Sequence, residues 1–241
     1  MNEIVLSHNS ITLSKANSLR RFERECQELS KQTRPKYKIT VIAHSGTTWG
    51  NLRMFKYLQE LPDRENGYIF IDGATYGEMD ILAIVEKISP LAAAFLKLPI
   101  FRSSVRKLIY DTEELGLETL DGVNSLEHLG KGLSGPEAFA IYDPTVTLFG
   151  LEDPEMFQIA LDMAKDENEP RHSLDDPYFA IARLRSEVMF NNLIRAMDTI
   201  EIREALVFFT AFHERTFAEQ ATLRKINYKS TFIFDLPKEG A

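Results

Sequence analysis

The sequence predicts an α/β protein with a mainly parallel central sheet, helices on both faces and an apolar helical insertion. Three runs rich in β-branched and apolar residues, at 39–43, 68–71 and 144–150, are typical of strands, and a polar residue follows each of them closely. Helix-forming stretches separate the runs, and a strand–helix–strand order requires right-handed crossovers with parallel pairing. We expect one domain over residues 1–241, with the helical insertion at about 76–135.

The first helix and the first strand follow from residue spacing. Apolar residues recur every three or four positions from Ser10 to Lys31, which predicts an amphipathic helix. They are Leu13, Ala16, Leu19, Phe22, Cys26 and Leu29. Ile39 to Ala43 is the first strand, after which Thr47 or Thr48 caps a helix that stops at Pro62.

Tyr68 to Ile71 is predicted as the second strand, and its continuous apolar character suggests burial on both faces. From Tyr76 to Phe101 the chain is markedly apolar, but charged residues and prolines interrupt it, so no transmembrane span is expected. Two short helices that form a lid or a buried hairpin are favoured over a membrane-surface segment. A further helix is expected from Phe101 to Leu115, and short helical pieces over 116–135.

The second half of the chain is predicted to be mostly helical. Pro144 to Gly150 is the third strand, and a helix begins near Pro154. A long helical stretch is expected from Tyr178 to about Ile226, with a break near Asp198. Ser230 to Asp235 is the last strand.

Composition limits the kinds of binding partner and the cellular location that we expect for the protein. The formal net charge of −8 argues against a nucleic-acid partner, because such binding needs a clustered basic face. The basic residues of the first helix lie among glutamates and predict a solvated helix face. The first eight residues lack the basic and apolar regions of a secretory signal, so a cytoplasmic location is expected. Cys26, the lone cysteine, is expected at a half-buried helix position and not as a nucleophile.

Polar residues at the carboxyl ends of the predicted strands form the candidate site. His44 follows the first strand, Asp72 the second, and Glu152 with Asp153 the third. The crevice beyond these strand ends is the usual ligand site of an open α/β sheet. One imidazole and several carboxylates there suit general acid–base chemistry or a divalent metal ion. The alternative, about as strong, is that these residues cap the helices that follow them.

Residues beside this rim are candidates for binding a substrate. Ser45, Thr47 and Trp49 follow His44 directly, although they lack the lysine and the glycine spacing of a phosphate-binding P-loop. His213 and Arg215 lie near the end of the long helical stretch, which could aim either at the rim. For Arg215, a surface ion pair with Glu219 four residues later is favoured.

Four segments, in chain order, resemble a known superfamily. They are Ile42-Ala43-His44, Ile71-Asp72, Phe149-Gly150-Leu151-Glu152-Asp153-Pro154 and Glu214-Arg215-Thr216-Phe217-Ala218. Together they look like the superfamily that includes the Tiki/TraB proteases, ChaN-like haem-binding proteins and erythromycin-esterase-like hydrolases. The resemblance implies the same fold over most of the chain, and a further histidine just after a strand that follows the late helix. The last predicted strand is followed by Leu236 and Pro237, so the sequence places no histidine there.

Two functional hypotheses follow. The first is a hydrolase-like enzyme, metal-assisted or not, that acts on a small molecule or a peptide, with His44, Asp72 and Glu152 as acids, bases or ligands and Arg215 orienting the substrate. The second is a non-catalytic binding protein whose apolar region at 81–101 holds haem, another hydrophobic ligand or a protein partner. A divalent metal is the cofactor that suits the rim residues, and a homo-oligomer is left open.

Overall fold

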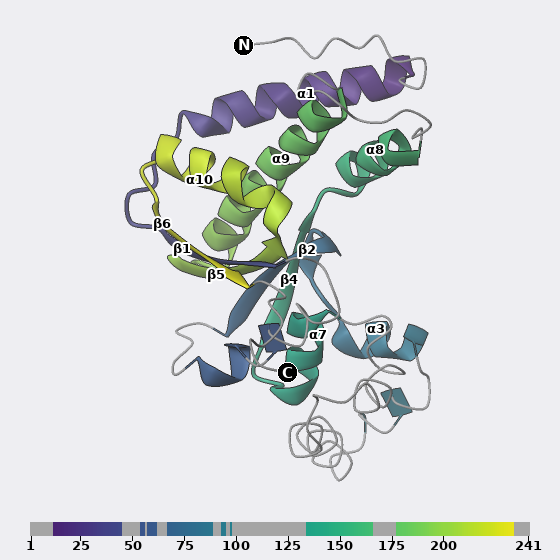
Figure 1. Ribbon diagram of the computed structural model, residues 1–241, viewed down its shortest axis with the longest axis vertical. Coiled ribbons are helices and arrows are strands. Elements are labelled where there is room, and N and C mark those ends of the chain that lie inside the picture. The colour runs from purple at the N-terminus through teal and green to yellow at the C-terminus, as the bar shows by residue number, and fades with distance from the viewer. Residues whose placement is uncertain are drawn as a thin grey trace, which may run out of the picture. The chain divides into compact units, whose positions relative to one another are not determined.

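A computed structural model describes residues 12–44, 54–55, 57–61, 67–88, 93–94, 97, 134–165 and 177–233. The chain divides into two compact units (Figure 1). Unit 1 comprises Met1–Ala43, Phe70–Gly77 and Phe149–Thr231, and unit 2 comprises His44–Ile69, Glu78–Leu148 and Phe232–Ala241.

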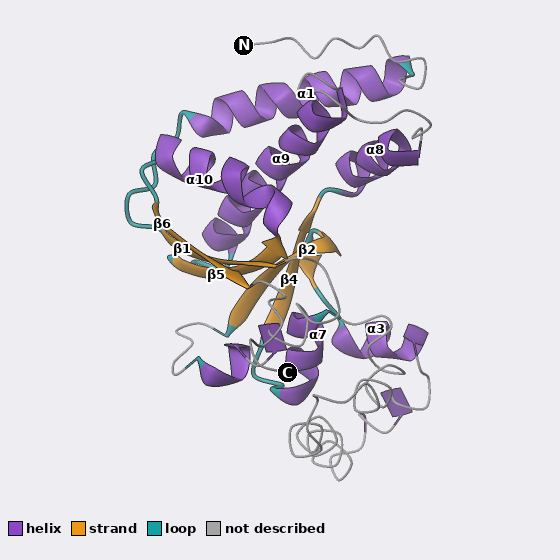
Figure 2. Ribbon diagram, in the orientation of Figure 1, coloured by secondary structure: helices purple, strands orange, loops and turns teal. Residues whose placement is uncertain are grey.

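The strands form one six-stranded sheet in the order β3-β4-β2-β5-β1-β6 (Figure 2). Their bounds are β1 Lys38–His44, β2 Tyr68–Thr75, β3 Gly77–Glu78, β4 Thr147–Glu152, β5 Glu204–Thr210 and β6 Asn227–Ile233. Backbone hydrogen bonds join the starts of neighbouring strands: Lys38 N donates to Arg203 O at 2.8 Å, and Asn227 N donates to Tyr37 O at 3.0 Å. Both pairs of strands are therefore parallel.

The α/β class and the mainly parallel sheet predicted from the sequence are confirmed. The connections from β1 to β2 and from β2 to β4 run toward one edge of the sheet, while those from β4 to β5 and from β5 to β6 run toward the other. Right-handed crossovers place connections of opposite direction on opposite faces. The exception is β3, which is antiparallel to β4 because Tyr76 N bonds Glu152 O while Met79 N bonds Leu148 O.

The end of β2 crosses over β4 at Gly150. A Cβ atom on Gly150 would lie 2.6 Å from the carbonyl oxygen of Ala74 and 2.8 Å from its carbonyl carbon, and closer still to the oxygen of Thr75. Only hydrogen leaves room for this crossing. The chain thereby passes from β2 on one side of β4 to β3 on the other.

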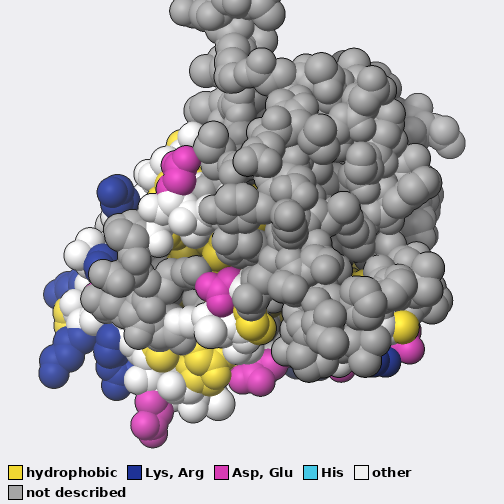
Figure 3. All heavy atoms as spheres, turned by 90° about the horizontal axis from the view of Figure 1, so that it is seen from below, with side chains coloured by type: hydrophobic (Ala, Val, Ile, Leu, Met, Phe, Trp, Pro, Cys, Tyr) yellow, Lys and Arg dark blue, Asp and Glu magenta, His cyan; other side chains and the backbone are white. Residues whose placement is uncertain are grey.

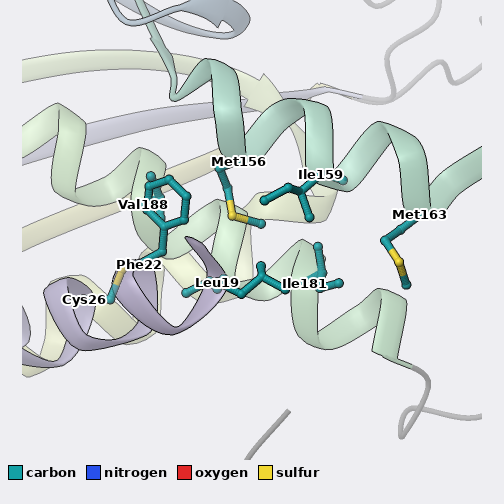
Figure 4. Packing of buried hydrophobic residues seen from close by; sticks show 10 residues of the cluster. Leu19, Phe22, Cys26, Met156, Ile159, Met163, Ile181 and Val188 are labelled. Carbon is teal, nitrogen blue, oxygen red and sulfur yellow. The ribbon is translucent and has the colours of Figure 1, made fainter. Parts of the chain in front are cut away.

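The helices of unit 1 pack around a common apolar core. They are α1 Leu13–Ser30, α8 Pro154–Lys165, α9 Pro177–Thr199 and α10 Glu214–Leu223, with the short 3-10 helix η1 Ala211–His213 before α10. The core cluster joins Leu19 and Phe22 of α1 to Met156 and Ile159 of α8 and to Val188 of α9 (Figure 4). Helix α1 lies within the predicted range Ser10 to Lys31, with Thr12 as its N-cap.

Cys26 is fully buried in this core, not half-buried as predicted. Asn191 of α9 donates to its sulfur at 3.1 Å, and the buried Arg224 donates in turn to Asn191. Burial raises the pKa of the Cys26 thiol to about 12, with Glu187 adding to the effect. A thiol with this pKa is protonated at neutral pH, so the prediction that Cys26 is not a nucleophile agrees with its surroundings.

Unit 2 contains part of the predicted insertion. Helices α3 Ile81–Ile88 and α7 Gly135–Tyr142 are described, and the buried Val85 and Ala93 pack with Ile81, Leu82 and Ile141. The helix predicted from Phe101 to Leu115, and most of the short helical pieces predicted over 116–135, lie outside the described residues. No helix in the described ranges is long and apolar enough to cross a membrane.

The helical stretch predicted from Tyr178 to about Ile226 is broken near Asp198, as expected, but the strand that follows the break was not predicted. Helix α9 ends at Thr199, and Glu204–Thr210 form β5 before α10 begins. The run Leu206-Val207-Phe208-Phe209 fits both helix and strand by hydrophobicity, but its aromatic and β-branched residues favour a strand. Strands β2 and β4 also extend further than predicted, so Asp72 and Glu152 lie within them.

Candidate functional site

Three adjacent strands bring polar side chains together at their carboxyl ends. Asp72 lies in β2, Glu152 ends β4 and Thr210 ends β5, and β2 lies between the other two strands. The chain leaves β2 toward β4 but leaves β5 in the opposite direction, toward β6. The carboxyl ends of β2 and β5 therefore flank a topological switch point, where open α/β sheets bind ligands.

Asp72 is the carboxylate nearest to solvent in this cluster. Its Oδ2 accepts hydrogen bonds from the backbone nitrogen of Thr210 at 2.8 Å and from Thr210 Oγ1 at 3.1 Å, while 15% of the side chain is exposed. Burial raises the pKa of Asp72, although the two hydrogen bonds from Thr210 and the charge of Arg185 oppose this effect. Asp72 can therefore hold a proton at a higher pH than an ordinary aspartate does.

His213 lies directly after β5, at the end of η1, and is almost completely buried. Its Nδ1 is 2.8 Å from Ser186 Oγ, and its Nε2 is 3.7 Å from Asp72 Oδ2. Burial lowers the pKa of His213 to about 3, and the positive charge of Arg185 lowers it further. The imidazole is therefore neutral at neutral pH. No histidine is visible among the described residues on the face shown in Figure 3.

Glu152 and Arg185 form a buried ion pair beside Asp72. Arg185 Nε donates to Glu152 Oε2 at 3.0 Å, and a second guanidinium nitrogen donates to Oε1, so the pair is bidentate. Gly73 N also donates to Oε1 at 3.2 Å. The guanidinium stacks over the ring of Phe157, 5.0 Å from its centre. Both oxygens of Glu152 are thus engaged by residues of unit 1.

The structure brings together three of the residues singled out from the sequence, namely Asp72, Glu152 and His213. Arg215 lies elsewhere, with 86% of its side chain exposed and its Nε 3.1 Å from Glu219 Oε1, which is the surface pair that its spacing favoured. His44 is buried at the end of β1 and is the first residue of unit 2.

The remaining predicted residues do not add to the cluster. Asp153 caps α8, because its Oδ1 accepts from the backbone nitrogens of Glu155 and Met156 at 3.0 Å each. For Asp153 the helix-cap alternative is therefore correct. Ser45, Thr47 and Trp49 lie outside the described residues.

Sequence reasoning missed Arg185, Ser186 and Thr210. Arg185 and Ser186 lie in a mostly polar part of α9, between the exposed Arg183 and the partly exposed Glu187, so the sequence does not distinguish them from surface residues. Thr210 and His213 were missed as neighbours because β5 was assigned to a helix. Correct recognition of that strand would have placed both residues at the rim.

The cluster does not provide a complete set of ligands for a metal ion. Asp72 and His213 have suitable donor atoms, but both oxygens of Glu152 are bound to Arg185. In the part of the chain that the structure describes, no group of three or more histidine, cysteine, aspartate or glutamate side chains could hold a metal.

The buried neutral imidazole predicts an acid-dependent loss of stability. The pKa of His213 is about 6.5 in the unfolded chain and about 3 in the folded one. The contribution of the neutral imidazole to the free energy of unfolding is therefore complete above pH 6.5 and is lost as the pH falls toward 3. The free energy of unfolding falls by up to about 1.4 kcal/mol per pH unit, and by at most about 5 kcal/mol in total. The raised pKa of the facing Asp72 acts in the opposite direction.

Urea unfolding of the wild type and of His213→Gln between pH 7 and pH 4 checks this prediction. The variant is expected to lose less stability on acidification than the wild type, whatever its stability at pH 7. Parallel pH dependences for the two proteins would show that His213 is not buried in its neutral form.

Comparison with known proteins gives no relative for this chain: no family model matches it, and neither a curated protein nor a solved structure is similar.

Proposed function

We propose that the protein is a hydrolase-like enzyme in which Asp72 is the general acid–base residue. The observation that carries the proposal is the position of Asp72: a partly exposed carboxyl with a raised pKa, beside a neutral imidazole, at the switch point of a parallel sheet. A small molecule or a peptide is the expected substrate, and the cytoplasm is the expected location.

The chemistry assigned to Asp72 is a proton cycle. As the carboxylate, Asp72 accepts a proton from a water molecule that attacks the substrate; as the neutral acid, it returns that proton to the leaving group. A raised pKa makes the carboxylate a stronger base and keeps the acid form available at a higher pH than in an ordinary aspartate. Thr210 orients the carboxyl group through two hydrogen bonds to the same oxygen, Oδ2.

Arg185 and Glu152 are proposed to set the electrostatics of the site and not to exchange protons. The guanidinium is close enough to Asp72 and His213 to lower the pKa of each, and its pairing with Glu152 holds it in place. We assign Arg185 the role of orienting the substrate that the sequence had suggested for Arg215. The part proposed for His44, as base or ligand, is kept as a prediction.

The resemblance to the Tiki/TraB, ChaN-like and erythromycin-esterase-like superfamily supports the proposal. It implies a histidine just after a strand that follows the late helix. The late helix of the resemblance, with Glu214 to Ala218, is α10, and the strand that follows it is β6, so His213 stands before this helix and is not the implied histidine. The resemblance supports the parts proposed for Asp72 and Glu152, which two of its segments contain.

Asp72→Asn tests the proposal. Asparagine keeps the size of the side chain and an oxygen that accepts from Thr210, but it cannot carry the proton. Turnover of whichever substrate the wild type cleaves, in a panel of chromogenic esters, phosphate esters and peptides, is expected to fall at least about 100-fold, with little change in Tm.

The matched control is Asp162→Asn, which removes a surface ion pair with Lys15 of α1 and should leave turnover unchanged. Activity that survives in Asp72→Asn would contradict the assignment of Asp72. A wild-type protein that binds haem or another hydrophobic ligand and turns over none of the panel would support the binding-protein hypothesis instead.

A further inference from the structure

Ser186 is placed to determine which nitrogen of His213 carries a hydrogen. It lies on α9, one position after Arg185, and its Oγ is 2.8 Å from His213 Nδ1. The same Oγ is 2.9 Å from the carbonyl oxygen of Ala182, one helical turn earlier. Both contacts are buried, so water does not substitute for either partner.

The two contacts of Ser186 require opposite roles from its hydroxyl. A carbonyl oxygen only accepts, so the single hydroxyl hydrogen is donated to Ala182 O. The Ser186 oxygen is then an acceptor toward His213, and Nδ1 must donate to it. We infer that Ser186 holds His213 in the Nδ1–H tautomer, so that Nε2 presents a lone pair to Asp72 in the resting site.

This tautomer fits the other surroundings of the imidazole. Nε2 faces Asp72 Oδ2 at 3.7 Å, which is beyond direct hydrogen-bond distance. The rings of Phe209 and Phe212 meet the imidazole edge-on, with centres 5.9 Å and 5.6 Å away. Burial lowers the pKa of His213 and raises the pKa of Asp72, so it favours the uncharged form of both groups. A neutral imidazole with its hydrogen on Nδ1 leaves Nε2 without one, as the inference requires.

Ser186 itself is not a nucleophile, although Ser186, His213 and Asp72 are the residue types of a catalytic triad. Only 1% of its surface is exposed, and its hydroxyl hydrogen is engaged within α9. A substrate cannot reach Oγ. Ser186 is therefore a positioning residue, and its value for catalysis rests on the proposed function, whereas the tautomer itself does not.

Nitrogen-15 NMR of the histidine side chains at pH 7, without substrate, measures the tautomer directly. The His213 signals are assigned by their loss in His213→Gln. In the wild type, Nδ1 is expected to resonate as a protonated nitrogen and Nε2 as an unprotonated one. Ser186→Ala should shift the tautomer ratio about tenfold or more toward Nε2–H, because Nδ1–H then lacks its buried acceptor. Ser186→Thr, which retains the hydroxyl, should restore the wild-type ratio.

Thr222→Ala is the control for the loss of a hydroxyl within a helix. Thr222 Oγ1 donates to Ala218 O at 2.8 Å, one turn earlier on α10, as the Ser186 hydroxyl does to Ala182 O on α9. It should leave the His213 signals unchanged. A proton on Nε2 in the wild type, or an unchanged ratio in Ser186→Ala, would overturn the inference even if Asp72 proves essential. The reverse result, the expected tautomer together with an inactive wild type, would reject only the proposed function.

Discussion

Gly150→Ala is expected to reduce the free energy of unfolding by more than about 3 kcal/mol. The added methyl group meets the backbone of Ala74 and Thr75 where β2 crosses β4, at separations of 2.8 Å or less. Backbone atoms cannot rotate away as the end of a side chain can, so either the crossing or β4 must move. Urea unfolding followed by circular dichroism measures the loss.

Gly73→Ala separates this steric effect from the general cost of replacing a glycine. Gly73 has a φ of +72°, but nothing lies within 4 Å of an added Cβ. Its replacement should therefore cost only about 1–2 kcal/mol, through strain in the left-handed region. If the two variants lost equal stability, the close crossing at Gly150 would not be the cause.

Arg185→Met is expected to destabilise the protein by about 3 kcal/mol, because it leaves the carboxylate of Glu152 buried without its cation. The Glu152 side chain is 3% exposed and that of Arg185 is 21% exposed, so solvent screens the remaining charge poorly. Gly73 N alone then supports Oε1. Thermal and urea unfolding measure the change.

The double variant Arg185→Met with Glu152→Gln tests whether charge is the cause. Glutamine keeps an acceptor for Gly73 N and removes the buried charge, so the double variant should recover at least half of the lost stability. Arg215→Met is the matched exposed case, since Arg215 also pairs with a glutamate and should cost less than about 0.5 kcal/mol. A double variant less stable than Arg185→Met would reject the explanation.

The spacing of apolar residues was enough to predict those helices and strands for which it has a single interpretation. Helix α1 has an apolar stripe at helical spacing and a threonine cap, and the apolar core of β2 is bounded by a turn and a polar residue, so both were recognised. Strand β5 was not, because Leu206 to Phe209 are apolar throughout and lie between two true helices. Its aromatic and β-branched residues favour a strand, and the paired strands on either side of it fix that assignment.

The candidate site was predicted in part for the same reason. Asp72 and Glu152 follow apolar strand cores, so their shared edge could be inferred from chain order and parallel pairing. Arg185 and Ser186 come from the middle of α9, and no local pattern indicates which turn of a helix faces a sheet edge. That information depends on the packing of α9 against α1, α8 and α10.

Helix α9 holds the ends of two strands with consecutive residues. Arg185 binds Glu152 of β4, and Ser186 binds His213 after β5, so the two contacts point about 100° apart around one helix axis. A single residue inserted into α9 before Arg185 would turn both side chains away together, along with the apolar stripe that packs on α1. The spacing between the ends of β4 and β5 therefore depends on how α9 is rotated about its own axis. Residues can be inserted only outside α9.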